Sequence, residues 1–518
     1  MTLRRPALAL CLSATLVAGC SGGGGEPGAS PDAEPTFVED GTFTMALQAD
    51  PGNLDPHSSA SSALFTVSQL AYDSLVSVDG ESGEILPQLA AEWSVDGTTV
   101  TFTLVDGVTC SDDSPFTAQT VADNIAYVGD PENESPFLGT FLPPGATATA
   151  DEGAGTVTLT LAQPAPFVLN GLASLPMVCD AGLEDRGSLT GGSAGTGPFR
   201  LTEAVPGDHY TYTRRDGYSW GKDGASTDAP GTPATVTMRI IENESTAANL
   251  LLSGEVNASE IMGPDAERLE QSGLFAAKTP ALIGEQWYNQ GSGHPTSEAD
   301  VRMALTQALD LAELQSVLTA GKGAPATTLA ALPPTACPGD SVSGSLPAQD
   351  VEAAEATLSG LPAMTFLYDS SAGSAVAAAA ELAVQQWKAA GADVTAKGQD
   401  ATALQQAIFG TGDWDIAWVP LNVNSPDQLV PFLSGPGAAE GGTNFAGIEN
   451  ADYAAAAEKA SALSGAESCA AWLEGDSAVV AAADVVPFAN NVVRTYGKGA
   501  RFEIPGELEP TSIRLVQE

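Results

Sequence analysis

The feature that most constrains the fold is an alternation of strand-like and helix-like segments that ends near residue 418. Apolar runs predict three strands and longer segments predict two helices, in the order 364–368 (strand), 374–390 (helix), 394–396 (strand), 403–409 (helix) and a strand from Trp414. Strands that alternate with helices pair in parallel through right-handed crossovers. The sequence therefore predicts an α/β fold that contains a doubly wound unit.

The last strand of this unit runs into a polar loop. Its segment, 413–435, begins with the apolar residues Ile416 and Trp418 and changes at Pro420 to residues typical of loops. In open α/β sheets, ligands bind at the carboxyl ends of the strands. Aromatic and amide side chains suited to a binding site are Trp287, Tyr288, Asn289, Trp414, Trp418, Asn422 and Asn424. A buried strand followed by an ordinary turn is the alternative for this segment taken alone.

The chain is too long for a single hydrophobic core. Its 518 residues predict two or three lobes. Alternating strands at 98–105 and 156–162, with a helix between them that begins after Thr117, predict a small α+β lobe. Further along, Ser297-Glu298-Ala299-Asp300 resembles a capping box, so we expect a helix to begin there with Ser297 as its cap.

The chain is strongly acidic, with 65 Asp and Glu against 19 Lys and Arg and a formal net charge of -46. A field of this sign repels nucleic acid and anionic lipid surfaces, which excludes a nucleic-acid partner. The net charge alone does not identify a ligand. We interpret it as a solubility feature of a protein that works in a salty or extracellular setting.

The N-terminus has the features of an exported lipoprotein. A basic pair, Arg4-Arg5, precedes an apolar run too short to span a membrane, which ends in Val17-Ala18-Gly19-Cys20. This ending resembles a bacterial lipobox, so we expect residues 1–19 to be a signal peptide and the thiol of Cys20 to carry lipid. Residues 20–35 then form a flexible tether at the outer face of the cytoplasmic membrane. A plain signal peptide with an incidental cysteine is the alternative.

Four cysteines remain beyond Cys11 and Cys20, namely Cys110, Cys179, Cys337 and Cys469. An even number of cysteines in an exported protein predicts disulfides. Three pairings are possible. We expect Cys110 to pair with Cys179 and Cys337 with Cys469, because each pair then stays within one lobe. Free buried thiols are the alternative, and a metal site is disfavoured because the chain has no C-x-x-C spacing and only three His.

A serine-hydrolase motif is present in form only. Gly191-Gly192-Ser193-Ala194-Gly195 matches G-x-S-x-G, but that motif needs a buried strand before it, whereas 183–189 carries Asp, Arg and Gly. The sequence also has no H-E-x-x-H, no phosphate-binding G-x-x-x-x-G-K loop and no Rossmann fingerprint after a strand. We therefore expect a binding protein rather than an enzyme, with no cofactor and no metal ion.

Short motifs follow one another in a fixed order from about Asp40 to the end of the chain. They are Asn53–Pro56, Tyr72–Val76, Leu86–Trp93, Phe102–Val108, Cys110–Ala118, Gly195–Phe199, Val301–Leu305 with Asp310, and Asp415–Asp427. In this order and spacing they resemble the family 5 extracellular solute-binding proteins of bacterial ABC importers, a group that includes peptide, nickel and some sugar binders.

The resemblance implies a two-lobed periplasmic-binding-protein-like fold of type II, cluster C, with an additional small α+β lobe. Lobe I would be discontinuous, lobe II would be the small one, and ligand would be enclosed between lobes I and III by hinge closure. The implied limits are 36–76, 194–284 and 485–518 for lobe I, 77–193 for lobe II and 285–484 for lobe III.

The resemblance also assigns candidate ligand-binding residues. The acid that holds the ammonium group in peptide binders aligns with Asn424, which cannot supply a charge. Further along, Asp427 matches an acidic position. The other positions that the resemblance or the aromatic and amide pattern places at the site are Ser59, Ser62, Phe137, Phe141, Tyr288, Asn289, Trp418 and Asn422.

The implied function is capture of a peptide or a similar small polar organic solute and its delivery to an ABC permease, by a monomer anchored to the membrane. Nickel is disfavoured because a bare ion prefers His-rich ligation and His57 is the only histidine near the expected site. The alternative is a sensory or interaction lipoprotein that binds a peptide signal without transport.

Overall fold

The computed structural model describes residues 36–80, 83–263, 265–333, 335–438, 441–463 and 465–517. The chain forms two units, 1–36 and 37–518, and the helices and strands given below belong to the second. The expected signal peptide, lipidation at Cys20 and tether therefore lie outside the described residues. Within the described ranges, no helix combines the length and apolar character needed to cross a membrane.

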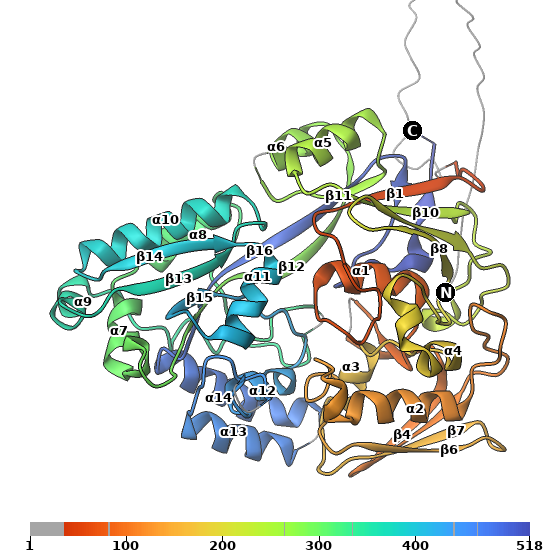
Figure 1. Ribbon diagram of the computed structural model, residues 1–518, viewed down its shortest axis with the longest axis horizontal. Helices are drawn as coiled ribbons and strands as arrows, with labels where there is room; N and C mark the ends of the chain where they lie inside the picture. Colours follow the sequence, from red (N-terminus) through yellow and green to blue (C-terminus); the bar gives the residue numbers. More distant parts are fainter. Residues whose placement is uncertain are drawn as a thin grey trace, which may run out of the picture. The chain divides into compact units, whose positions relative to one another are not determined.

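A mixed sheet of ten strands runs through the second unit in the order β14-β13-β15-β12-β16-β11-β1-β10-β9-β8 (Figure 1). Its strands are β1 (Thr42–Leu47), β8 (Phe199–Val205), β9 (His209–Arg214), β10 (Thr235–Ile240), β11 (Ala258–Glu260), β12 (Phe275–Tyr288), β13 (Met364–Asp369), β14 (Val394–Gln399), β15 (Ile416–Trp418) and β16 (Val485–Gly497). The segments expected to form lobes I and III thus share one hydrogen-bonded sheet.

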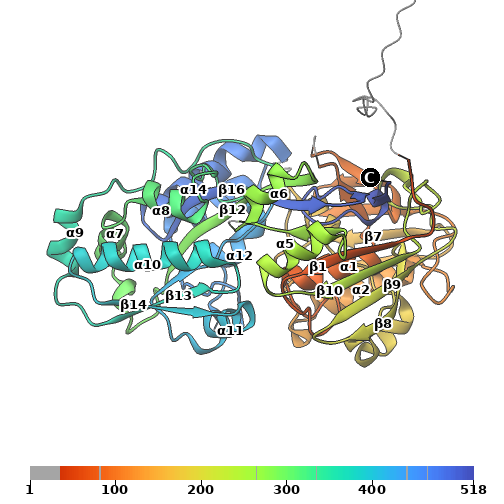
Figure 2. The same cartoon turned by 90° about the horizontal axis from the view of Figure 1, so that it is seen from above.

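The doubly wound unit is confirmed. β13 pairs in parallel with both β14 and β15, and α10 (Ser374–Ala389) and α11 (Ala401–Gln406) connect them. Phe366 packs in the cluster that contains the apolar face of α10, whereas its neighbour Leu367 packs with Leu404 of α11. Since adjacent side chains of a strand point to opposite faces, the two helices cover opposite faces of the sheet. Figure 2 shows α10 alongside β13 and β14.

Two long antiparallel strands, β12 and β16, join the two halves of the sheet. Their ladder runs from Phe275, opposite Gly497, to Trp287, opposite Val485, and its register shifts on both sides of Gly284. A Cβ at position 284 would lie 2.7 Å from the side chains of both Ala489 and Phe488, so only glycine fits there. The ladder is therefore irregular at the residue where we expected lobe I to meet lobe III.

The small α+β lobe has a four-stranded antiparallel sheet in the order β4-β5-β7-β6, and α2 packs on it (Figure 1). Its elements are β4 (Ala90–Asp96), β5 (Thr99–Leu104), α2 (Ala118–Gly129), β6 (Thr147–Asp151) and β7 (Thr156–Thr160). The hydroxyl of Thr117 accepts a hydrogen bond from the N–H of Thr120, so Thr117 caps α2 as predicted. Val121 and Ile125 of the helix and Phe102 of the sheet share one apolar cluster.

The remaining elements connect these layers. The other helices are α1 (Ser62–Ala71), α3 (Val168–Ala173), α4 (Asp180–Glu184), α5 (Glu244–Ser253), α6 (Asp265–Gln271), α7 (Ala299–Gln307), α8 (Leu311–Leu318), α9 (Val351–Leu358), α12 (Val430–Leu433), α13 (Ala451–Ser461) and α14 (Cys469–Ala481). The short strands are β2 (Val76–Val78), β3 (Ile85–Pro87), β17 (Ala500–Arg501) and β18 (Arg514–Leu515).

The predicted capping box at Ser297 is wrong. The N-cap of α7 is Glu298, which makes no side-chain capping bond. Pro295–Ser297 forms a 3₁₀ turn immediately before the helix, and the Ser297 hydroxyl donates instead to the carbonyl of His294 at 2.7 Å. The hydroxyl therefore stabilises the turn rather than the helix.

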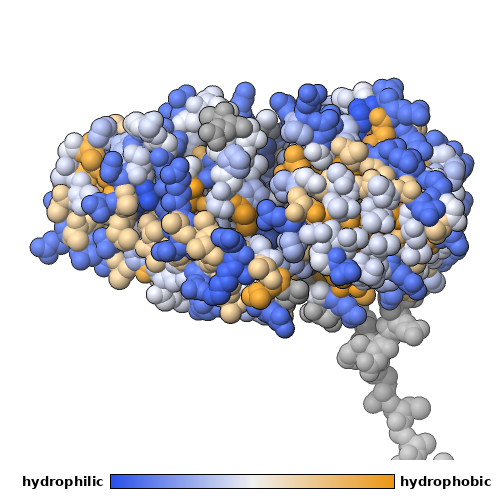
Figure 3. All heavy atoms as spheres, turned by 90° about the horizontal axis from the view of Figure 1, so that it is seen from below, coloured by the Kyte–Doolittle hydropathy of each residue, from blue (hydrophilic) through white to orange (hydrophobic). Residues whose placement is uncertain are grey.

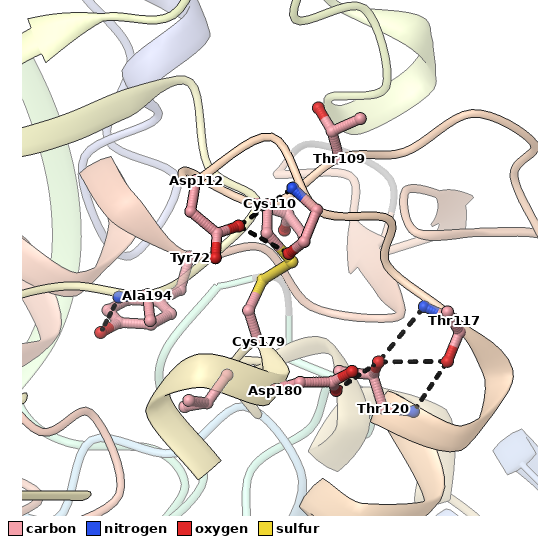
Figure 4. The surroundings of a disulfide bond; sticks show 12 residues. Tyr72, Thr109, Cys110, Asp112, Thr117, Thr120, Cys179, Asp180 and Ala194 are labelled. Atoms are coloured by element: carbon pink, nitrogen blue, oxygen red, sulfur yellow. Dashed lines mark hydrogen bonds between the residues drawn. A yellow bond between two sulfur atoms is a disulfide. The ribbon is translucent and has the colours of Figure 1, made fainter. Parts of the chain in front are cut away.

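Both expected disulfides are present, Cys110–Cys179 and Cys337–Cys469. Figure 4 shows the first of them beside the N-terminal end of α4, where the carboxylate of Asp180 accepts a hydrogen bond from the Thr120 hydroxyl of α2 at 2.7 Å. The disulfide and this bond together hold α4 against the small lobe. The molecular face in Figure 3 is mostly hydrophilic, with hydrophobic residues in scattered patches.

Candidate functional site

The loop that follows β15 is fixed to β12 by side-chain hydrogen bonds. The amide of Asn422 accepts a bond from the N–H of Leu282 and donates one to its carbonyl, each at 3.0 Å. The N–H of Leu421 donates to Oε2 of Glu285 at 2.7 Å. Asn422 therefore positions the loop through both groups of its amide. We call residues 419–427 the exit loop.

Asn424 and Asp427 lie in the exit loop, and one acceptor of Asn424 is unmatched. The Asn424 carbonyl accepts from the N–H of Ala336 at 2.7 Å, whereas its Oδ1 is buried and has no hydrogen-bond partner among the described residues. Oδ1 of Asp427 accepts from the Ser425 hydroxyl at 2.5 Å. Burial raises the pKa of Asp427 to about 6, against the opposing effect of the Ser425 bond.

Three other predicted site residues are buried where β12 pairs with the last strand of the doubly wound unit. The Tyr288 hydroxyl bonds to Gln286 and Thr306, and the indole N–H of Trp418 donates to Gln286 Oε1 at 3.1 Å. The Asn289 amide donates to the carbonyls of Gly412 and Trp414. These side chains join β12 to the strand and loop beside it, so their polar atoms are engaged within the protein.

Ser59, Ser62 and Phe137 lie near the start of α1 and in the small lobe. The Ser59 hydroxyl accepts from the N–H of Ser61 at 3.1 Å, and Ser62 is exposed in the first turn of the helix. Phe137 is buried among Phe65 and Phe141, with ring centroids 5.6 and 4.8 Å away. This second group belongs to a different part of the chain from the exit loop.

The small lobe and the exit loop approach each other in one contact region. Phe167 of the small lobe packs in the apolar cluster that contains Trp287 and residues flanking the exit loop. A Cβ at Gly139, which neighbours Phe137 in the chain, would lie 3.4 Å from the Pro431 side chain of α12. The small lobe therefore contacts lobe III beside the exit loop.

Sequence reasoning missed Glu285. This residue is fully buried in β12, and its carboxylate receives the Leu421 N–H. Burial raises its pKa to about 8. Acidic residues are almost never fully buried without a partner, so a lone Glu within an apolar strand was the signal that could have identified this residue.

Sequence reasoning also missed an ion pair between Asp55 and Arg186. The guanidinium of Arg186 donates to both carboxylate oxygens of Asp55 and lies 3.9 Å from the centre of the Tyr127 ring. His57 Nε2 lies 2.7 Å from the carbonyl oxygen of Pro176. Burial lowers the pKa of His57 to about 4, so this histidine is neutral at physiological pH and is part of the scaffold.

The G-x-S-x-G match is not a nucleophile elbow. Helical turns at Asp180–Glu184 and Arg186–Thr190 precede Ser193, where the elbow requires a strand. The Ser193 hydroxyl accepts from the N–H of Leu201 at 3.4 Å. Ser193 therefore has a local structural partner rather than the geometry of a nucleophile.

The shared sheet, the doubly wound unit and the polar exit loop define a two-lobed α/β binding protein. The family model for bacterial extracellular solute-binding proteins, family 5 (middle), matches residues 84–440. The chain belongs to this family, whose members are the solute-binding components of ABC importers and are not enzymes.

Relatives of known function match over part of their length. The oligopeptide-binding protein OppA of Bacillus subtilis (strain 168) is 25% identical over 362 residues, which cover 65% of this chain and 64% of OppA. The glutathione-binding protein GsiB of Escherichia coli O1:K1 / APEC is 28% identical over 292 residues, 55% of each chain. The chain thus matches less than two thirds of the length of these curated relatives.

A solved structure matches over nearly the whole chain. It is a substrate-binding protein from Microbacterium hydrocarbonoxydans complexed with 4-hydroxybenzoate hydrazide, with 29% identity and a TM-score of 0.80. The match covers 92% of this chain and 100% of that one. The two proteins therefore share the same arrangement of sheet and helices.

Proposed function

We propose that this protein is the membrane-anchored solute-binding component of an ABC importer and that it captures a peptide or a similar polar organic solute. The observation that carries the proposal is the exit loop: it is fixed to β12, yet Oδ1 of Asn424 is buried without a partner among the described residues. An unmatched acceptor at the carboxyl end of a strand is suited to a ligand that donates hydrogen bonds. Ligand-binding roles for Ser59, Ser62, Phe137 and the exit-loop residues are part of this proposal.

The proposed ligand is enclosed between lobe I (36–76, 194–284 and 485–518) and lobe III (285–484), with lobe II (77–193) beside them. The register shifts around Gly284 support a hinge at this boundary, because the β12–β16 ladder is interrupted there. Hinge closure around a ligand is the usual motion of two-lobed binding proteins. The closed form would then dock on the permease.

The proposed anchor is a lipid on Cys20, followed by the tether 20–35. Its support is the lipobox-like Val17-Ala18-Gly19-Cys20 after a short apolar run. Intact-mass measurement of the protein extracted from bacterial membranes tests this directly: lipidation predicts loss of residues 1–19 and a diacylglycerol mass on Cys20, which a Cys20→Ala variant lacks.

The ligand class is tested by native mass spectrometry and by thermal shift against peptides, oligosaccharides and metal chelates. A ligand that binds only the folded state adds about 2.7 kcal/mol of stability at a hundredfold excess over its dissociation constant. A shift with peptides supports the proposal, and a shift with sugars or chelates alone contradicts the peptide class but not solute binding. No shift with any probe would contradict the proposed solute binding and favour an interaction with a partner other than these solutes.

A further inference from the structure

A second concave site lies at the end of the β12–β16 ladder that is farthest from the exit loop. It is a pocket of about 400 Å³ between the last turn of α5, the turn that follows α6 and the chain that leaves β16. Figure 1 shows α5 and α6 side by side at this end of the ladder. We call it the basic pocket, and the side chains that line it are Leu252, Ser272, Leu274, Phe275, Lys498 and Arg501.

The basic pocket is separate from the candidate ligand site. Phe275 is the first residue of β12 and pairs with Gly497, whereas the exit loop is bonded to Leu282 of the same strand. Leu282 lies seven positions further along this extended strand, which is about 23 Å at the usual rise per residue. A small molecule held in the basic pocket therefore does not reach the exit loop.

The charge of the pocket is opposite to that of the whole chain. The sequence has 65 Asp and Glu against 19 Lys and Arg, yet the pocket is lined by two basic residues and by no acidic one. Among the described residues neither Lys498 nor Arg501 forms an ion pair, in contrast to Arg494 of β16, which pairs with Glu270. The two cations of the pocket are therefore available to an anionic ligand.

Both cations are held in place by contacts that leave donors free. Lys498 is half-buried, and its Nζ donates to the carbonyl of Leu252 at 2.6 Å, at the C-terminal end of α5, where the helix dipole favours a positive charge. The guanidinium carbon of Arg501 lies 5.0 Å from the centre of the Phe275 ring. One of its nitrogens, Nη1, donates to the carbonyl of Ala500 at 2.9 Å. Since an ammonium has three N–H donors and a guanidinium five, each retains donors for a ligand.

We propose that the basic pocket binds the phosphate group of a phospholipid at the membrane surface. A phosphate offers several oxygen acceptors, so it can contact Arg501 and Lys498 together, and a guanidinium can bind two of these oxygens at once. The apolar side chains of Leu252, Leu274 and Phe275 line the remainder of the pocket and suit the glycerol part of the lipid.

The choice of a phospholipid as the source of the phosphate follows from where the N-terminal segment joins the fold. Phe37 forms a backbone bridge with Val516. The N–H of Val516 donates in turn to the carbonyl of Gly499 at 3.0 Å, next to Lys498 in the chain. The proposed lipid on Cys20 and its tether therefore join the fold beside the basic pocket. This choice rests on the proposed anchor, whereas the phosphate chemistry of the pocket does not.

The net charge of the chain gives the pocket a consequence for orientation. A net charge of -46 repels an anionic membrane surface. Two cations that no carboxylate neutralises give one end of lobe I a local attraction to lipid phosphates. The pocket would therefore orient lobe I on the membrane, in addition to holding a lipid.

The test is calorimetric titration of the purified full-length chain carrying Cys20→Ala, which has no lipid of its own. The probes are dihexanoylphosphatidylglycerol below its micelle concentration, glycerol 3-phosphate and inorganic phosphate. Each cation beside a phospholipid surface contributes about fivefold in affinity, so the double change Lys498→Gln and Arg501→Gln should weaken lipid binding about thirtyfold. Added salt should weaken binding to the unchanged pocket.

Two further variants separate a specific site from a general effect of charge. Lys278 is exposed on β12, three residues beyond Phe275 and outside the pocket, so Lys278→Gln removes the same charge close by. This control should keep the lipid affinity of the unchanged pocket. Arg501→Gln alone should weaken the lipid about fivefold. Arg501 is exposed and bonds to a neighbouring carbonyl, so the melting temperature of this variant should stay that of its parent.

The outcomes distinguish this inference from the proposed function. Equal weakening by Lys278→Gln, or absence of binding by all three phosphates, would overturn the inference. Glycerol 3-phosphate or inorganic phosphate that binds as tightly as the lipid would support a phosphate site and contradict a membrane lipid as its source. The double variant should keep the thermal shifts that solutes produce, so a failure here leaves solute binding intact. Absence of lipid on Cys20 by intact mass would contradict the anchor and leave the phosphate site intact.

Discussion

Replacing Asp476 with Asn should stabilise the ligand-free protein, and increasingly so as the pH rises. Asp476 is 1% exposed, and burial raises its pKa to about 7, whereas an Asp in the unfolded chain titrates near 3.8. Between these values the folded protein holds a proton that the unfolded chain has released. Folding stability therefore falls by about 1.4 kcal/mol per pH unit across this window, a total of about 4 kcal/mol above pH 7.

The amide that Asp476→Asn introduces does not titrate, so the variant lacks this loss. Urea unfolding followed by tryptophan fluorescence should show the two proteins nearly equal at pH 4 and the Asp476→Asn variant more stable by up to about 4 kcal/mol at pH 8. If the whole chain unfolds in one transition, this corresponds to a rise of roughly 3–4 °C in melting temperature. Glu474→Gln, on the exposed side of α14, is the matched control and should change stability little at either pH. A difference between Asp476→Asn and wild type that stays constant with pH, or a variant less stable at pH 8, would refute the reasoning.

Three further changes test the scaffold. Arg302→Met should cost about 3–5 kcal/mol in urea unfolding, because it leaves Asp484 buried without its ion-pair partner; the additional change Asp484→Asn should recover part of this loss, and an unchanged double variant would contradict it. His57, with its pKa lowered to about 4, is neutral when folded, whereas in the unfolded chain it takes up a proton around its ordinary pKa of 6.5. The wild-type protein should therefore lose about 3 kcal/mol of folding stability as the pH falls from 7 to 4. The stability difference between wild type and His57→Gln should narrow over that range. The paired change Cys337→Ser and Cys469→Ser opens a link across 132 residues and should cost up to about 5 kcal/mol in the chain-entropy account, measured as a lower urea midpoint. The variant keeps the Cys110–Cys179 disulfide, so reduced wild type, which loses both, should unfold at a still lower urea concentration.

The elements that the sequence predicted well are those whose signal is local. The strands and helices from Met364 to Trp418 depend on short apolar runs and on the longer segments between them, and the structure has them in the predicted order and pairing. The Thr117 cap is likewise a contact between residues three apart. Such features need no knowledge of the rest of the fold.

The candidate site could be predicted only in outline, because its contacts join distant segments. Asn422 matches a loop in sequence, but its two bonds to Leu282 span 140 residues. The carboxylate of Glu285 accepts the N–H of Leu421, and the charge of Asp476 contributes to its raised pKa. Both residues are distant in sequence, so no local pattern links them to Glu285. At Ser297 the local pattern was misleading, since the turn at Pro295 presents a closer acceptor for the hydroxyl than the helix does.

The strand order of the large sheet also determines when the chain can fold. β11 stands between β1 and β16, so its two edges are paired with the first strand of the sheet and the last. Ala258 lies opposite Met45 on one side and Gly497 on the other. An edge left open is a site for mispairing with other chains, and contacts between such distant segments form slowly. A chain synthesised from its N-terminus therefore keeps an open edge at β11 until Val485–Gly497 has followed. Pairing of this last strand then completes the sheet.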